Sequence, residues 1–183
     1  ALAQLNPVTG DIAGNLARAR AARDTVRDAD LILFSELFIT GYPPEDLVLK
    51  PALQQDARAA IESLAADTAS GPAILIGAPW VEDHKLYNAF LLLEGGKVAD
   101  RTFKVDLPNY GVFDEKRVFS TGPSPKPFTI GGIKIGVPVC EDIWTDKVSL
   151  CLKDAGAEIL AVPNGSPFEA GKEEYRLLLA KSR

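Results

Sequence analysis

Residues 73–78 read Ala-Ile-Leu-Ile-Gly-Ala, an apolar run without a polar interruption. A second run of this kind, Leu-Ile-Leu-Phe, occupies residues 31–34. Strands that are buried on both faces read as continuous apolar runs, because neither face meets water. Before these runs, residues 11–28 and 51–66 carry apolar side chains at spacings of three or four, which predicts amphipathic helices. This alternation favours an α/β fold in which helices cover a sheet.

The middle of the chain adds antiparallel strands. Apolar segments at residues 87–93 and 97–103 flank a glycine turn, and the same hairpin pattern recurs over residues 128–139. A further apolar strand over residues 158–162 follows a helix predicted for residues 147–155. We therefore expect sheets of mixed direction, and no repeat or linker divides the chain.

Composition narrows the function classes. The chain has 183 residues, of which 46% are hydrophobic and 25% are charged, as in ordinary folded proteins. Its net charge of −5 offers no basic excess for nucleic acid, and its apolar runs are too short to span a membrane. Two cysteines at this length do not make the disulfide framework of a secreted protein. We expect a cytoplasmic protein that binds neither nucleic acid nor membrane.

The chain contains no methionine and closes within a helical pattern at residues 177–183. We therefore expect residues 1–183 to form one domain that is incomplete at its C-terminus. Such a domain would be a piece of a longer polypeptide.

Three reactive side chains stand where predicted strands end: Glu36, Lys104 and Cys140. Ligands of α/β sheets gather outside the carboxyl ends of the strands, so these groups are candidates for one site. A cysteine–histidine pair is poorly supported, because the one histidine, His84, lies in a polar loop. Glu36 could instead take the thiol proton. Lys104 could then stabilise the thiolate and a developing oxyanion, helped by the backbone N–H of Glu141.

Simpler roles remain open for the same residues. Cys140 could be a core residue, Glu36 could cap the next segment, and Lys104 could be a solvated charge. Cys151 lies between two leucines in a predicted helix, and a core position explains it best. Asp142 could cap a turn or touch a substrate.

Four longer strings carry a family resemblance. They are FSELFITGYPPEDL at residues 34–47, KVDLPNYGVFDEKR at residues 104–117, VCEDIW at residues 139–144 and PNGSPF at residues 163–168. Together they resemble the carbon–nitrogen hydrolase (nitrilase) superfamily, whose members place a Glu–Lys–Cys triad on an αββα sandwich. The resemblance implies a nitrilase-like α/β sandwich with mixed sheets, incomplete here at the C-terminus. Within the superfamily, the strings are most similar to the N-terminal glutaminase domains of glutamine-dependent NAD synthetases.

The resemblance also implies residue roles. Glu36 corresponds to the proton acceptor, Lys104 to the second catalytic residue and Cys140 to the nucleophile. Glu115 corresponds to the acidic residue that orients the lysine. The positions that hold glutamine in this subgroup match Tyr110, Ser166 and Lys172. Taken locally, these three could equally be a turn aromatic, a turn former and a solvated charge at a helix start.

The implied reaction is hydrolysis of L-glutamine to glutamate and ammonia through a cysteine thioester. The resemblance implies no metal or other cofactor for this domain. It implies ATP and Mg²⁺ for a separate synthetase domain that amidates deamido-NAD, and this chain carries no G-x-x-x-x-G-K phosphate loop. The expected partners are that synthetase domain and, since family members assemble, further copies of the chain.

Two other functions compete with this interpretation. A stand-alone amidase of the same superfamily would use the same triad on another small amide. A non-catalytic α/β binding module would not need Glu36, Lys104 and Cys140 together.

Overall fold

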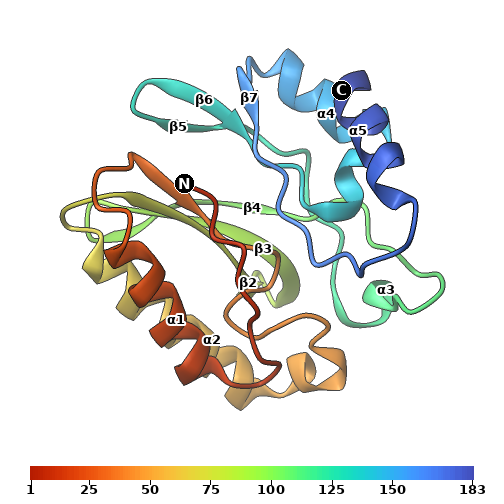
Figure 1. Cartoon of the computed structure of the whole chain (residues 1–183). Coiled ribbons are helices and arrows are strands. Elements are labelled where there is room, and N and C mark those ends of the chain that lie inside the picture. Colours follow the sequence, from red (N-terminus) through yellow and green to blue (C-terminus); the bar gives the residue numbers. More distant parts are fainter.

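The computed structural model describes residues 1–183 and contains two separate sheets (Figure 1). The first sheet has the order β1-β2-β3-β4, with β1 parallel to β2 and the other neighbours antiparallel. The second has the order β5-β6-β7, with β5 antiparallel and β7 parallel to β6. The strand bounds are β1 (Leu31–Leu33), β2 (Ala73–Glu82), β3 (Lys85–Glu94), β4 (Lys97–Phe103), β5 (Phe128–Ile130), β6 (Ile133–Gly136) and β7 (Ile159–Leu160).

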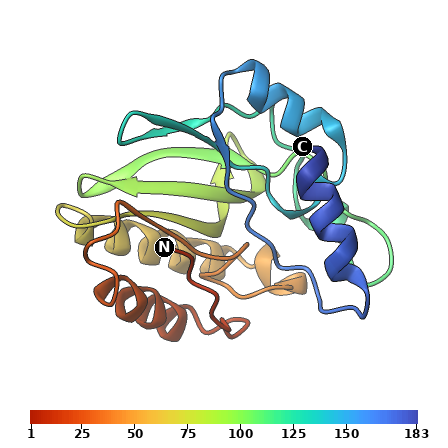
Figure 2. The ribbon, with the colours of Figure 1, turned by 45° about the horizontal axis from the view of Figure 1, so that its top comes forward.

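Five α-helices and two short 3₁₀ segments complete the fold. Two helices, α1 and α2, lie side by side against the first sheet, while α4 and α5 lie at the opposite side of the molecule (Figures 1 and 2). None of the helices combines the length and the apolar composition that a membrane span requires. Their bounds are α1 (Ile12–Asp24), α2 (Pro51–Asp67), α3 (Glu115–Val118), α4 (Asp146–Asp154) and α5 (Lys172–Ser182), with 3₁₀ segments η1 (Glu45–Leu49) and η2 (Cys140–Ile143).

The apolar run in strand β2 is buried on both faces of the first sheet. Its side chains alternate between two hydrophobic cores, since successive residues of a strand point to opposite faces. Ile74 and Ile76 pack in the core that α2 helps to build, whereas Leu75 packs in a core shared with the second sheet. The first sheet is therefore covered on both faces, by helices on one side and by the second sheet on the other. This layering confirms the expected α/β sandwich of mixed sheets.

Several predicted element bounds were wrong. The strand predicted for residues 73–78 continues to Glu82 and turns back into β3 through Asp83 and His84. Both turn residues have positive φ, of 48° and 60°, as the tight turn of a two-residue hairpin requires. Hydrophobicity alone misses this extension, because the strand runs on through a proline and a glutamate. The two last predicted strands are also shorter in the structure, at β6 and β7.

Candidate active site

Glu36 is placed by a sharp bend directly after β1. The backbone crosses closely over β2 at this point, where a Cβ added to Gly77 would lie 2.3 Å from the Leu37 nitrogen. Only glycine leaves room for this approach. Leu37 itself adopts a positive φ of 47°, which turns the chain away behind the glutamate. The Glu36 side chain consequently lies in the interior, with 1% of its surface exposed.

Lys104 joins Glu36 and Glu115 in a buried ionic cluster. Its Nζ lies 2.7 Å from Glu36 Oε1 and 2.8 Å from Glu115 Oε1. Burial lowers the pKa of Lys104, but the two carboxylates outweigh burial and raise the pKa above its ordinary value. Burial raises the pKa of Glu115, against the opposing effect of Lys104. The cluster therefore holds two acidic side chains around one cation, away from water.

Three neutral donors supply the rest of the hydrogen bonding. Asn88 donates from Nδ2 to Glu36 Oε1 at 2.8 Å and lies 3.4 Å from Glu115 Oε2. The Tyr42 hydroxyl donates to Glu115 Oε1 at 2.8 Å, and the Gly165 N–H donates to Glu36 Oε2 at 2.8 Å. Each donor offsets part of the carboxylates' loss of hydration.

Gly165 brings a distant loop into this cluster. A Cβ added to it would lie 2.7 Å from the Tyr42 ring and 3.0 Å from Glu36 Oε2. The loop can therefore reach the Glu36 carboxylate only through a residue without a side chain. Sequence reasoning singled out neither Tyr42 nor Asn88. Asn88 could have been found from the sequence, because it is a polar residue within the otherwise apolar strand β3.

Cys140 begins the short turn η2 rather than ending a strand. Its φ is 50°, an unusual backbone conformation for a residue other than glycine, and its N–H donates to the Pro163 carbonyl at 2.9 Å. Burial raises the pKa of the thiol, and Glu36 raises it further, whereas Lys104 acts in the opposite direction. A carboxylate and an ammonium therefore act on the ionisation of the thiol in opposite directions.

The residue after the cysteine has two separate functional groups. No hydrogen bond within the protein engages the Glu141 N–H, so it is free to donate to a bound oxygen. The Glu141 carboxylate accepts from the Tyr110 hydroxyl, with 2.9 Å to Oε2. Burial and this carboxylate raise the pKa of Tyr110 to about 12.

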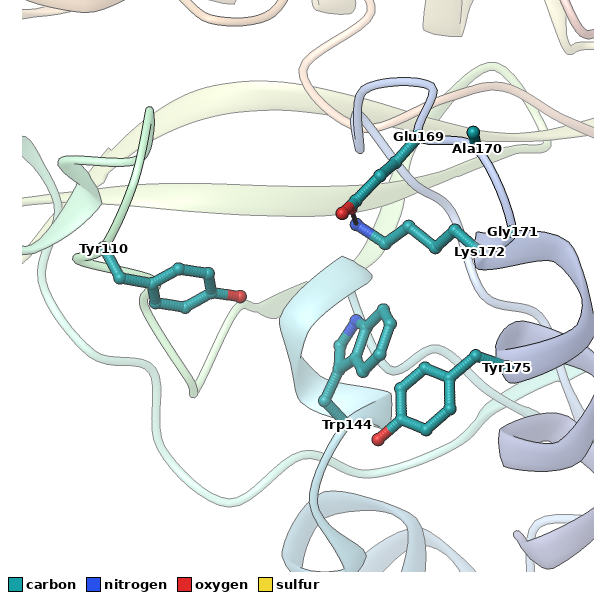
Figure 3. Close-up of a pocket in the computed structure, with 7 residues that line it drawn as sticks. All are labelled: Tyr110, Trp144, Glu169, Ala170, Gly171, Lys172 and Tyr175. Carbon is teal, nitrogen blue, oxygen red and sulfur yellow. Dashed lines mark ion pairs between the residues drawn. The ribbon is translucent and has the colours of Figure 1, made fainter.

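A pocket of about 380 Å³ opens beside η2 and the start of α5 (Figure 3). Trp144 is half-buried, lies on its floor and faces Tyr175, with ring centroids 5.3 Å apart. Lys172 Nζ lies 3.4 Å from Glu169 Oε2 and 5.4 Å from the Trp144 ring. The lining residues are Tyr110, Trp144, Glu169, Ala170, Gly171, Lys172 and Tyr175.

The structure thus brings most of the expected site residues together, in two adjoining groups. Glu36, Lys104, Glu115 and Cys140 form the buried group, and Tyr110 and Lys172 line the pocket. Cys140 itself does not line the pocket, but Glu141 connects the groups through its contact with Tyr110.

Other candidates lie apart from both groups. Ser166 is half-buried in the loop between them and does not line the pocket. Cys151 is half-buried on α4 rather than part of the core, with its Sγ 3.6 Å from the Pro125 carbonyl oxygen. His84 lies in the turn between β2 and β3. No three or more His, Cys, Asp or Glu side chains are arranged to hold a metal ion.

Comparison with known proteins extends these observations. The family model described as carbon-nitrogen hydrolase matches residues 1–183. The glutamine-dependent NAD(+) synthetase of Rhodobacter capsulatus is 47% identical over 184 residues, covering 100% of this chain and 33% of the relative. The corresponding enzyme of Thermotoga maritima is 41% identical, covering 96% of the chain and 31% of the relative. The chain therefore spans about a third of the length of the curated relatives it matches.

Solved structures agree with the sequence comparison. A glutamine-dependent NAD+ synthetase from Acinetobacter baumannii superimposes with a TM-score of 0.88 at 38% identity, over 96% of this chain and 34% of the other. An amidase from Nesterenkonia sp. superimposes with a TM-score of 0.80 at 27% identity, over 97% of this chain and 68% of the other.

Proposed function

The chain belongs to the carbon–nitrogen hydrolase family, and on this premise we propose that it hydrolyses the side-chain amide of L-glutamine to glutamate and ammonia. The observation that carries the proposal is the buried contact of Lys104 with Glu36, beside the Cys140 thiol. A base, a cation and a nucleophile withdrawn from water are what amide cleavage requires.

In the first step, Glu36 accepts the thiol proton while Cys140 Sγ attacks the amide carbon. The transfer moves a proton between two adjacent groups, so the net charge of the cluster does not change. The carbonyl oxygen becomes an oxyanion, which Lys104 and the free N–H of Glu141 stabilise. Cys140 is 3% exposed, so bulk water has little access to the thiol.

The tetrahedral adduct then collapses to a thioester. The C–N bond breaks, and protonated Glu36 returns its proton to the leaving nitrogen, which departs as ammonia. A water molecule next gives a proton to Glu36 and attacks the thioester carbon. The Cys140 sulfur leaves and recovers the proton, so one glutamine and one water yield one glutamate and one ammonia.

Glu115 acts as a positioning residue in this scheme. Its Oε1 lies 2.8 Å from Lys104 Nζ and also accepts from the Tyr42 hydroxyl. Two carboxylates on one ammonium leave Lys104 little freedom to turn away, because its charge has no other buried partner.

Specificity for glutamine would come from the pocket of Figure 3. The substrate's α-carboxylate and α-ammonium both need polar partners once they leave water. Lys172 offers a cation for the carboxylate, and the Tyr110 hydroxyl offers a further hydrogen bond. The names of the relatives support glutamine as the amide.

In a longer polypeptide, this domain would supply ammonia to a synthetase domain that amidates deamido-NAD. ATP and Mg²⁺ would act in that second domain. The fraction of each relative that the chain covers supports such an arrangement. We further expect the protein to be cytoplasmic and to assemble into homo-oligomers.

The direct experiment is mass spectrometry of a quenched reaction with glutamine. We expect a glutamyl adduct on Cys140 and none on Cys151, together with stoichiometric release of ammonia. The Cys140→Ala variant should be inactive, whereas Cys151→Ala should retain the parent rate. An active Cys140→Ala variant would refute the thioester.

A second candidate is hydrolysis of another small amide, supported by the likeness to the Nesterenkonia amidase. Comparing glutamine with its simplest analogue, butyramide, separates the two functions. Preference for butyramide would favour the amidase, because that amide lacks both α-groups.

A further inference from the structure

A buried carboxylate lies two residues beyond the nucleophile. Asp142 is 1% exposed, and its three hydrogen bonds all come from backbone N–H groups. Oδ1 accepts from Val105 at 3.0 Å and from Asp106 at 2.7 Å. Oδ2 accepts from Val139 at 3.0 Å. Both oxygens thus accept hydrogen bonds within the protein, so the side chain is not available to bind a substrate.

The three donors belong to the two segments that carry the proposed chemistry. Val105 and Asp106 directly follow Lys104, at the end of β4 in the first sheet. Val139 directly precedes Cys140, on the chain that leaves β6 in the second sheet. The Asp142 carboxylate therefore ties the lysine segment to the cysteine segment across the two sheets.

The backbone hydrogen bonds of Lys104 itself come from segments outside the second sheet. Its N–H donates to the Asn88 carbonyl of β3 at 2.9 Å, and its carbonyl accepts from Gly122 at 2.9 Å. Neither contact reaches the second sheet. At Cys140, the positive φ persists only if the surrounding bonds hold it. The Asp142 N–H contributes one of them, to the Val139 carbonyl at 3.1 Å.

We infer that Asp142 is a positioning residue, which sets the placement of the Lys104 ammonium relative to the Cys140 sulfur. The inference deepens the proposed amide hydrolysis and rests on it, because the placement matters for catalysis only if the site cleaves an amide. The family to which the chain belongs does not by itself give Asp142 this role; the three hydrogen bonds above do.

The choice of aspartate over asparagine follows from the same contacts. A carboxylate accepts on both oxygens, whereas an amide accepts on one side and donates on the other. In the Asp142→Asn variant, an N–H would face either the Val139 N–H or the N–H groups of Val105 and Asp106. Because the two side chains have nearly the same volume, this variant changes the hydrogen bonding and not the packing.

A double-mutant cycle with Lys104 tests the inference. Asp142→Asn alone should lower kcat for glutamine about 30–100-fold, as a misplacement on the order of 1 Å can cost 10²-fold, with a smaller change in KM. In a Lys104→Met background there is no ammonium to place, so the same substitution should lower the residual kcat by less than about threefold. Equal fold-losses in both backgrounds, or a parent-like kcat in Asp142→Asn, would overturn it.

Loss of folding must be separated from loss of placement. Circular dichroism and thermal melting should identify the folded variants, and Lys104→Gln, which also lacks the charge, replaces Lys104→Met if the latter fails to fold. Leu64→Ala, on the buried face of α2, is the matched destabilised control. It should lower the melting temperature and leave the kcat of the folded protein unchanged.

A second readout makes failure of the inference distinguishable from failure of the proposed function. The rate of Cys140 alkylation by iodoacetamide is measured in the same four proteins, each with Cys151→Ala. Asp142→Asn should change this rate, in either direction, when Lys104 is present. The same substitution should leave the rate unchanged in the Lys104→Met background. A parent that alkylates but does not split glutamine would overturn the proposed function, and the alkylation cycle would still decide the role of Asp142.

Discussion

The Lys104 ammonium lies 2.7 Å from a Glu36 carboxylate oxygen, and both side chains are withdrawn completely from solvent. A buried ion pair of this kind contributes little net stability, because desolvation of both charges offsets their attraction. Its consequence is placement: a base and a cation are held side by side next to a cysteine thiol.

Lys104→Met should lower kcat for glutamine by about two to three orders of magnitude, because one stabiliser of the oxyanion is lost. It should also lower the free energy of unfolding by about 3–5 kcal/mol, because two buried carboxylates lose their cation. Steady-state kinetics and denaturant unfolding measure the two effects. Lys97→Met, exposed at the start of the same strand, is the matched control and should change neither. Near-normal turnover in Lys104→Met would mean that the lysine is a bystander.

Ionisation of Cys140 should respond in opposite directions to its two neighbours. Glu36 raises the pKa of the thiol, so Glu36→Gln should move the midpoint of its alkylation to lower pH. Lys104 lowers the pKa, so Lys104→Met should move the midpoint to higher pH. Alkylation by iodoacetamide, followed against pH in a Cys151→Ala background, measures both shifts. Glu36→Gln should nevertheless turn over glutamine far more slowly, because the base is gone. Shifts of the same sign would contradict the geometry.

Asp142 should make stability depend on pH in an unusual direction. Burial raises the pKa of this carboxyl to about 6, against the opposing backbone hydrogen bonds. The folded state therefore binds the proton more tightly than the unfolded state does. The contribution of Asp142 to stability is fully present below about pH 4 and is lost as the pH rises through 6.

The measurement is the unfolding free energy of the parent minus that of Asp142→Asn, from pH 4 to pH 7. Groups shared by both proteins cancel in this difference. A shift of about two pKa units predicts that this difference in unfolding free energy falls by roughly 3 kcal/mol, to the disadvantage of the parent, as the pH rises over this range. A difference that does not vary with pH would indicate an ordinary carboxyl.

Asn88→Ala should destabilise the protein by about 1–3 kcal/mol, since a buried carboxylate loses a donor. It should also lower kcat/KM for glutamine, because the Glu36 carboxylate loses a hydrogen bond that holds its orientation. Asn109→Ala, on the surface, is the control. If stability falls and kcat/KM stays at the parent value, Asn88 supports the fold alone.

Lys172→Ala should raise KM for glutamine roughly ten- to hundredfold, as expected for the loss of a charged hydrogen-bond partner. KM for butyramide should stay unchanged, because this amide has no α-carboxylate. The competing contact with Glu169 is partly exposed and 3.4 Å long. Glu169→Gln should therefore lower KM for glutamine by a few-fold at most, since exposed pairs contribute about 0–1 kcal/mol. Equal effects of Lys172→Ala on both amides would exclude Lys172 as the carboxylate partner.

Much of this protein can be predicted from short-range patterns. The apolar runs at residues 31–34 and 73–78 predicted doubly buried strands, because a strand with protein on both faces has no polar side. Glu36 and Lys104 were expected at strand ends, where α/β sheets place their ligands. The bounds of β2 and β6 were predicted poorly, because pairing with a neighbouring strand decides where a strand ends.

Only the tertiary structure decided which groups meet. Lys104 is 68 residues from Glu36, Asn88 is 52 residues from Glu36, and Asp142 is 37 residues from Val105. A hydrogen bond depends on distance and angle, and burial depends on all surrounding segments, so neither can be inferred from neighbours in sequence. The sequence by itself therefore determined the layers of the fold and the residue types available for chemistry. Packing of the two sheets determined that a lysine, two glutamates and a cysteine share one interior site, with Asp142 joining the lysine and cysteine segments.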